Sequence, residues 1–164
     1  MRRLCLLTSA FCLVTLLIPS PASADMTGFL GLNATPQRRA LKGLAVGAGL
    51  LIAGFEVEYA DTSEDLLLRG PRLRTFMFNG LVQTPIPIAR MQFYGTAGGG
   101  GYREGFSDLP NGTKTNVAIN VGGGAKISLA GPIRLRLDYR VFTLKGSPRY
   151  ATVQRFYAGI NLKF

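Results

Sequence analysis

The 164-residue sequence contains no histidine, no tryptophan and only two cysteines. Histidine is the usual proton carrier in catalysis near neutral pH and the commonest metal ligand. Its absence removes the general base of Ser-His-Asp hydrolases, and we expect neither a metal nor a cofactor. The acidic residues Asp61, Glu64 and Asp65 could bind a divalent cation, but a solvated acidic loop is the favoured interpretation.

Both cysteines fall in an N-terminal segment that is typical of a secretory signal peptide. Two arginines precede an apolar run over 4–18, prolines follow it, and Ala22-Ser23-Ala24 fits a small-residue cleavage site. We predict a signal peptide over 1–24 and a mature domain over 25–164. An uncleaved transmembrane helix is the less favoured alternative. The mature chain then has no cysteine, which excludes disulfides and thiolate chemistry.

Beyond this segment no apolar run is long enough to span a membrane as a helix. The chain instead shows short runs of alternating apolar and polar residues separated by turn signals, which predicts an all-β fold. We expect eight strands, over 26–34, 41–51, 53–61, 72–84, 90–104, 113–128, 132–144 and 150–164. Short turns should follow the second, fourth and sixth strands, and longer polar loops the others. This layout predicts an antiparallel up-and-down barrel with both termini at one end.

The last nine residues, FYAGINLKF, alternate strictly and end on an aromatic carboxylate. Together with the export signal, they resemble the end of the eight-stranded bacterial outer-membrane β-barrels, the OmpA transmembrane domain and OmpX type. The resemblance implies a transmembrane barrel in a Gram-negative outer membrane, reached through the export translocon and the periplasm. In that family the assembly machinery of the outer membrane reads the last strand. The residues that would carry this signal here are Tyr157, Gly159, Leu162 and Phe164.

A membrane barrel turns its apolar side chains outward and its polar side chains inward. In the strand over 132–144, leucines alternate with arginines and an aspartate, and the strand over 53–61 has two glutamates in alternate positions. An eight-stranded barrel is too narrow for an open channel, so inward charges must pair. We predict an internal network of Glu56, Glu58, Lys126, Arg134, Arg136, Asp138 and Arg140. A narrow, anion-preferring pore is the alternative.

Two glycine-rich segments, 98–101 and 122–124, could suggest phosphate-binding loops. Neither supplies the Lys-Ser or Lys-Thr pair that opens a helix in a P-loop. Glycines in adjacent strands instead let a small barrel bend and leave room for large inward side chains.

The formal net charge is +10, and many basic residues fall in or beside the predicted outer loops. Arginine pairs bidentately with phosphate, so we expect lipopolysaccharide contacts at Arg38, Arg39, Arg103 and Arg149. No nucleic-acid recognition module is visible. We predict a monomeric, non-enzymatic outer-membrane barrel with an envelope-structural or surface-interaction role. The alternatives are a narrow channel for small solutes and a secreted soluble barrel that binds an apolar ligand.

Overall fold

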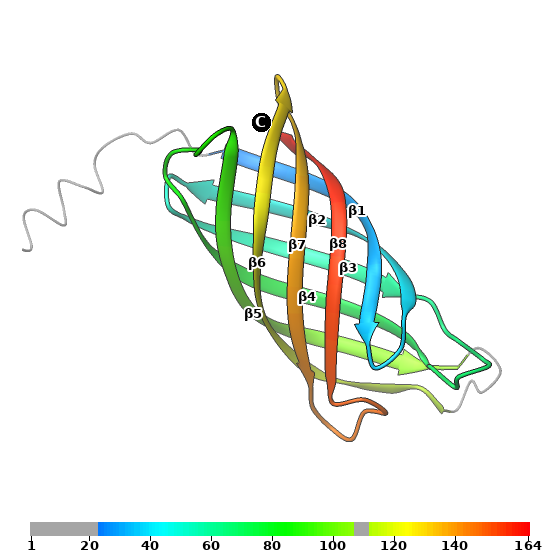
Figure 1. Cartoon of the computed structure of the whole chain (residues 1–164). Coiled ribbons are helices and arrows are strands. Elements are labelled where there is room, and N and C mark those ends of the chain that lie inside the picture. The colour runs from blue at the N-terminus through cyan, green and yellow to red at the C-terminus, as the bar shows by residue number, and fades with distance from the viewer. Residues whose placement is uncertain (1–22, 107–111) are drawn as a thin grey trace, which may run out of the picture.

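The computed structural model describes residues 23–106 and 112–164 and shows eight antiparallel strands (Figure 1). The strands are β1 (Ser23–Thr35), β2 (Arg39–Leu50), β3 (Ala53–Thr62), β4 (Arg72–Gln83), β5 (Met91–Gly105), β6 (Lys114–Ala130), β7 (Ile133–Leu144) and β8 (Thr152–Lys163). Each predicted strand is confirmed, with boundaries shifted by three residues or fewer. Within the described residues no helix is long and apolar enough to cross a membrane.

The sheet closes into a barrel because β8 pairs with β1. Gly28 lies opposite Ile160 and Leu30 lies opposite Ala158 in this antiparallel pair. The predicted antiparallel barrel is therefore confirmed as a closed sheet. Closure leaves no strand edge with unpaired backbone groups.

The two ends of the barrel differ. The C-terminus and the start of β1 lie at one end, which we call the terminal end (Figure 1). Two-residue turns over 51–52 and 131–132 lie at the same end, whereas the loops over 63–71 and 145–151 lie at the opposite end, the loop end. The expected alternation of short and long connections fails at two places: the connection over 36–38 at the loop end has only three residues, and that over 84–90 at the terminal end has seven, as many as the loop over 145–151.

The predicted signal peptide lies outside the described residues except for its last two positions. Ser23 and Ala24 belong to β1 and pair with Gly49 and Ala48 of β2. Cleavage after Ala24 stays a prediction.

The strand alternation places apolar side chains on the outer wall and polar side chains in the lumen. Leu30, Phe55 and Phe78 are 70%, 79% and 60% exposed, although each lies within a regular strand. Their chain neighbours on the inward parity, such as Phe29 and Glu56, are buried. A barrel in water would show the reverse pattern, so this wall matches an apolar solvent.

Two glycines of β6 face the lumen and make room for the side chains that fill it. A Cβ atom at Gly122 would lie 2.1 Å from the Tyr139 carbonyl oxygen and 2.8 Å from Cα of Arg140. A Cβ atom at Gly124 would lie 2.6 Å from the Tyr94 hydroxyl oxygen. The glycines therefore serve close packing of neighbouring strands and large side chains.

We expect Gly122→Ala to destabilise the barrel by about 1–3 kcal/mol, the usual cost of overpacking a filled interior. The matched control is Gly95→Ala, because a Cβ atom at Gly95 meets nothing within 4 Å. Urea unfolding of the two variants in detergent measures the difference. Equal unfolding midpoints would show that β6 has no need of glycine at this position.

Candidate functional site: the filled lumen

Three arginines and three carboxylates meet in the middle of the lumen, and all six are buried. They are Arg136, Arg140, Arg155, Glu56, Glu58 and Asp138, which we call the central network. Arg140 is its hub. Its Nη2 atom lies 2.7 Å from Glu56 Oε1, and its Nη1 atom lies 3.1 Å from Glu58 Oε2. Its Nε atom donates to Asp138 Oδ1 at 2.9 Å.

The other two arginines extend the central network in both directions along the barrel. Arg136 forms an ion pair with Glu56, and its Nη2 atom lies 3.0 Å from Asp138 Oδ2. Arg155 Nη1 lies 3.3 Å from Glu58 Oε1. Three positive charges thus face three negative charges, so the network is neutral. Neutrality and multiple hydrogen bonds offset the large cost of removing these ions from water.

Two tyrosine hydroxyls add hydrogen bonds to the central network. The Tyr157 hydroxyl accepts from Arg140 Nη2 at 3.0 Å and lies 2.9 Å from Asp138 Oδ2. The Tyr94 hydroxyl donates to Asp138 and accepts from Arg136 Nε at 2.7 Å. Each hydroxyl therefore links a carboxylate to an arginine, which fixes both groups in place.

An apolar cluster fills the lumen between the central network and the loop end. It consists of Leu73, Met77, Tyr102, Ala118, Phe142, Leu144 and Val153. The Arg155 guanidinium carbon lies 4.2 Å from the centroid of the Phe142 ring, so the charged and apolar layers are in direct contact. Water crossing the barrel would have to pass both layers.

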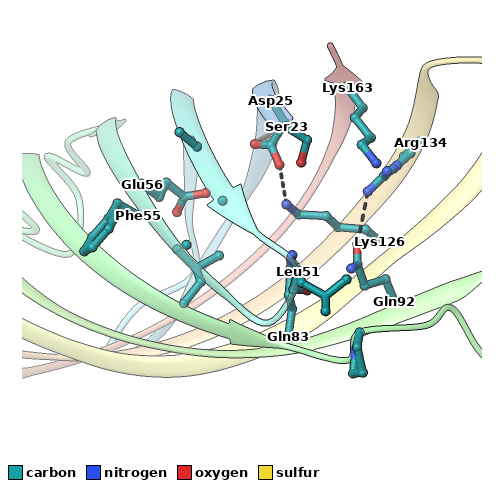
Figure 2. Close-up of a pocket in the computed structure, with 16 residues that line it drawn as sticks. Ser23, Asp25, Leu51, Phe55, Glu56, Gln83, Gln92, Lys126, Arg134 and Lys163 are labelled. Carbon is teal, nitrogen blue, oxygen red and sulfur yellow. Dashed lines mark hydrogen bonds and ion pairs between the residues drawn. The ribbon is translucent and has the colours of Figure 1, made fainter. Parts of the chain in front are cut away.

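A polar cavity opens at the terminal end of the lumen (Figure 2). It has a volume of about 140 Å³, and Asp25, Gln92, Lys126 and Arg134 line it. Figure 2 shows Lys126 bound to Asp25 and Arg134 bound to Gln92, the latter over 3.1 Å. Glu56 also lines the cavity, so the central network forms its inner limit.

The structure brings five of the seven predicted lumen residues into the central network: Glu56, Glu58, Arg136, Asp138 and Arg140. The other two also lie on the lumen side, as predicted, but outside the central network. Lys126 forms its ion pair with Asp25, and Arg134 bonds to an amide rather than a carboxylate. Both lie nearer the terminal end, where the buried Lys126 has Asp25 as its counter-ion and Arg134 borders the polar cavity.

Sequence reasoning missed Arg155, which supplies the third positive charge. It precedes Phe156 in β8 and shares the inward parity of Tyr157, so the same alternation contained the signal. It lies directly opposite Arg140 in the β7–β8 register. Two like charges in adjacent positions are tolerated here because Glu58 contacts both.

The four arginines expected at the surface differ in exposure. Arg38, Arg103 and Arg149 are exposed. Surface exposure of Arg39 was a wrong prediction, because its side chain is 4% exposed and Nη1 donates to the Pro71 carbonyl oxygen. Arg39 is the first residue of β2 and points inward, as does Leu41 two positions later. Its side chain therefore lies beneath the loop over 63–71.

The four proposed assembly-signal residues divide between the two faces of β8. Tyr157 and Gly159 point inward, where the Tyr157 ring stacks on Phe29 with centroids 4.1 Å apart. Leu162 and Phe164 are exposed on the outer wall. The Phe164 amide donates to the Ala24 carbonyl oxygen at 2.8 Å, which holds the chain end against β1.

The acidic residues weighed as a cation site are not assembled as one. Asp61 accepts two hydrogen bonds from Arg72. Across the described ranges, no group of three or more histidine, cysteine, aspartate or glutamate side chains is placed to hold a metal ion.

No protein-family model and no curated protein matches this sequence. Solved structures do match. The N-terminal β-barrel domain of Pseudomonas aeruginosa OprF superposes with a TM-score of 0.66 and 13% identity, covering 87% of this chain and 97% of that domain. Neisserial surface protein A gives a TM-score of 0.65 and 14% identity, with 87% and 96% coverage.

A third match is the outer-membrane enzyme PagL, with a TM-score of 0.54, 13% identity, and coverage of 84% of this chain and 98% of PagL. These likenesses establish that the chain has the fold of the eight-stranded bacterial outer-membrane β-barrels. Because the same fold includes an enzyme, activity must be argued from the side chains rather than from the architecture.

Proposed function

We propose that this chain is an integral barrel of the Gram-negative outer membrane, closed to solutes and without enzymatic activity. Its role is to support the envelope or to present its outer loops for surface interactions. The observation that carries the proposal is a lumen filled by a neutral ionic network, inside a wall whose exposed side chains are apolar. In this arrangement the terminal end faces the periplasm and the loop end faces outward.

Membrane fractionation with heat-dependent gel migration tests this location and fold. The protein should remain in the outer-membrane fraction, migrate as a compact species in detergent, and shift only after boiling. Release into buffer without detergent would instead support the soluble barrel. That alternative also predicts an apolar lumen, whereas the lumen here contains the charges.

The absence of enzymatic activity rests on chemistry rather than on fold. The sequence has no histidine to serve as general base. The buried carboxylates are held by arginines and tyrosines, so they are not free to accept a substrate proton. Incubation of the purified barrel with lipopolysaccharide and phospholipid should release no fatty acid. If fatty acid is released and the Asp138→Asn variant releases as much, a contaminant is the source. Release by the wild type that Asp138→Asn abolishes would overturn the proposal.

The exposed arginines of the outer loops support a contact with lipopolysaccharide. Arg38 and Arg149 lie at the loop end, and each can present its guanidinium to phosphates beyond the membrane surface. We expect Arg38→Gln with Arg149→Gln to weaken binding of complete lipopolysaccharide, with a loss that shrinks as salt is added because exposed charges are screened. Unchanged binding at low salt would remove these loops from the interaction.

A further inference from the structure

A row of charged side chains crosses the outer wall near the loop end. The backbone register places Lys42 of β2 opposite Asp61 of β3, Asp61 opposite Arg74 of β4, and Arg74 opposite Arg103 of β5. All four share the outward parity of their strands. We call these residues, with Arg72, the wall row.

The wall row marks the upper limit of the apolar band. The next outward-facing residues toward the terminal end on β2, β3 and β4 are Leu44, Tyr59 and Phe76, which are 52%, 44% and 47% exposed. In a membrane, this boundary is the depth at which lipid headgroups begin. The row therefore faces headgroups rather than open water.

The charges of the wall row do not balance. Asp61 is shared between Arg72, which binds it through two nitrogen atoms, and Arg74, whose Nε atom lies 3.7 Å away. Arg103 stands next to Arg74 on the opposing strand. Like charges directly opposite each other destabilise an antiparallel pair unless a counter-ion lies between them.

A cavity of about 190 Å³ lies at this like-charged pair. Its described lining consists of Arg72, Arg74 and Arg103 with Gly105, Phe106 and Thr113, and within residues 23–106 and 112–164 no acidic side chain lines it. The Arg74 Nε atom is buried and has no hydrogen-bond partner. Glu64 lies on the far side of Arg72, in a separate hollow with Lys42 and Asp61. The described lining of the cavity is thus basic, and because Arg72 is held by Asp61 through two nitrogen atoms, Arg74 and Arg103 are the arginines left to meet an occupant.

We propose that this cavity binds the phosphate of a lipid headgroup in the outer leaflet, with Arg74 and Arg103 as its principal ligands. Guanidinium groups suit a phosphate because their paired N–H groups match its oxygens. A phosphate between Arg74 and Arg103 also supplies a counter-ion for Arg103, which forms no ion pair within the described residues, and a second one for Arg74. The site rests on the proposed outer-membrane location, and it differs from the loop contact because it lies on the wall, at headgroup depth.

The test measures binding of diphosphoryl lipid A, which lacks the core and outer polysaccharide that would reach the loops, to the refolded barrel in uncharged detergent. The Arg74→Gln/Arg103→Gln variant should bind it at least about tenfold more weakly, because charge-assisted hydrogen bonds contribute more than neutral ones. The matched Arg38→Gln/Arg149→Gln variant removes the same charge from the loops and should bind like the wild type. Dephosphorylated lipid A should bind the wild type and the Arg74→Gln/Arg103→Gln variant weakly and equally.

Four results would overturn the proposal. One is equal affinity of the wild type and Arg74→Gln/Arg103→Gln, and another is an equal loss in the loop variant, which would indicate general charge attraction. The third is displacement of lipid A by an equal concentration of inorganic phosphate, which would indicate a free-anion site. Heat-dependent gel migration of each variant confirms that it is folded. A wild type that migrates as a folded membrane barrel but binds no lipid A would end this inference and leave the proposed function standing.

Discussion

Replacing Arg140 with methionine should destabilise the folded barrel by about 3–5 kcal/mol, the usual cost of removing one partner from a buried ionic group. Arg140 contacts all three carboxylates of the central network and the Tyr157 hydroxyl. Its loss leaves two arginines against three carboxylates in a buried space. Urea unfolding in detergent, followed by gel migration, measures the effect.

Arg134→Met is the matched control, because it removes the same side chain from the same strand two positions beyond Arg136. Arg134 lies at the open cavity and bonds to Gln92, so the change should cost less than about 1 kcal/mol. Equal destabilisation by the two variants would contradict the distinction between the central network and the terminal-end cavity. A second variant, Glu58→Gln in the Arg140→Met background, should recover part of the lost stability, since it restores the charge balance.

Deleting Phe164 should reduce the amount of barrel assembled in cells severalfold while changing the stability of the barrel refolded in detergent by less than about 1 kcal/mol. The side chain is 74% exposed, and the residue contributes one backbone hydrogen bond, to Ala24. It therefore stabilises the finished barrel little, so a large effect in cells must arise during assembly.

Tyr157→Phe supplies the contrast. This change removes a hydroxyl from the central network and keeps the aromatic ring, so it should lower the stability of the refolded barrel. Normal assembly of the chain that lacks Phe164 would show that the end of β8 is a structural strand without a signal role.

The faces of the barrel could be predicted from the sequence because a strand has a period of two. Glu56, Glu58 and Arg136 had to point the same way as the residues two positions before and after them. Once one residue of a strand is assigned to the lumen, the direction of the others follows. The identity of the ion pairs could not be predicted, because partners across the lumen depend on the stagger of strands far apart in the chain. Lys126 accordingly pairs with Asp25, a residue 101 positions away.

Arg39 and Arg155 show the other limit of the sequence. Arg39 seemed to belong to a loop, but β2 begins at that residue and its parity buries it. Arg155 directly precedes the C-terminal segment FYAGINLKF and lies opposite Arg140 on β7. Two like charges opposite each other in an antiparallel pair are disfavoured. Only the three-dimensional position of Glu58 explains why the strand accepts it.

The central claim is that the lumen is closed, and electrical recording across a planar bilayer tests it most directly. The refolded wild-type barrel, checked for compact migration before insertion, should give no stable conductance in symmetrical salt at either polarity. The same preparation of a barrel with an open pore provides the positive control. Discrete, reproducible conductance steps from the folded wild type would contradict the account and establish the narrow channel instead.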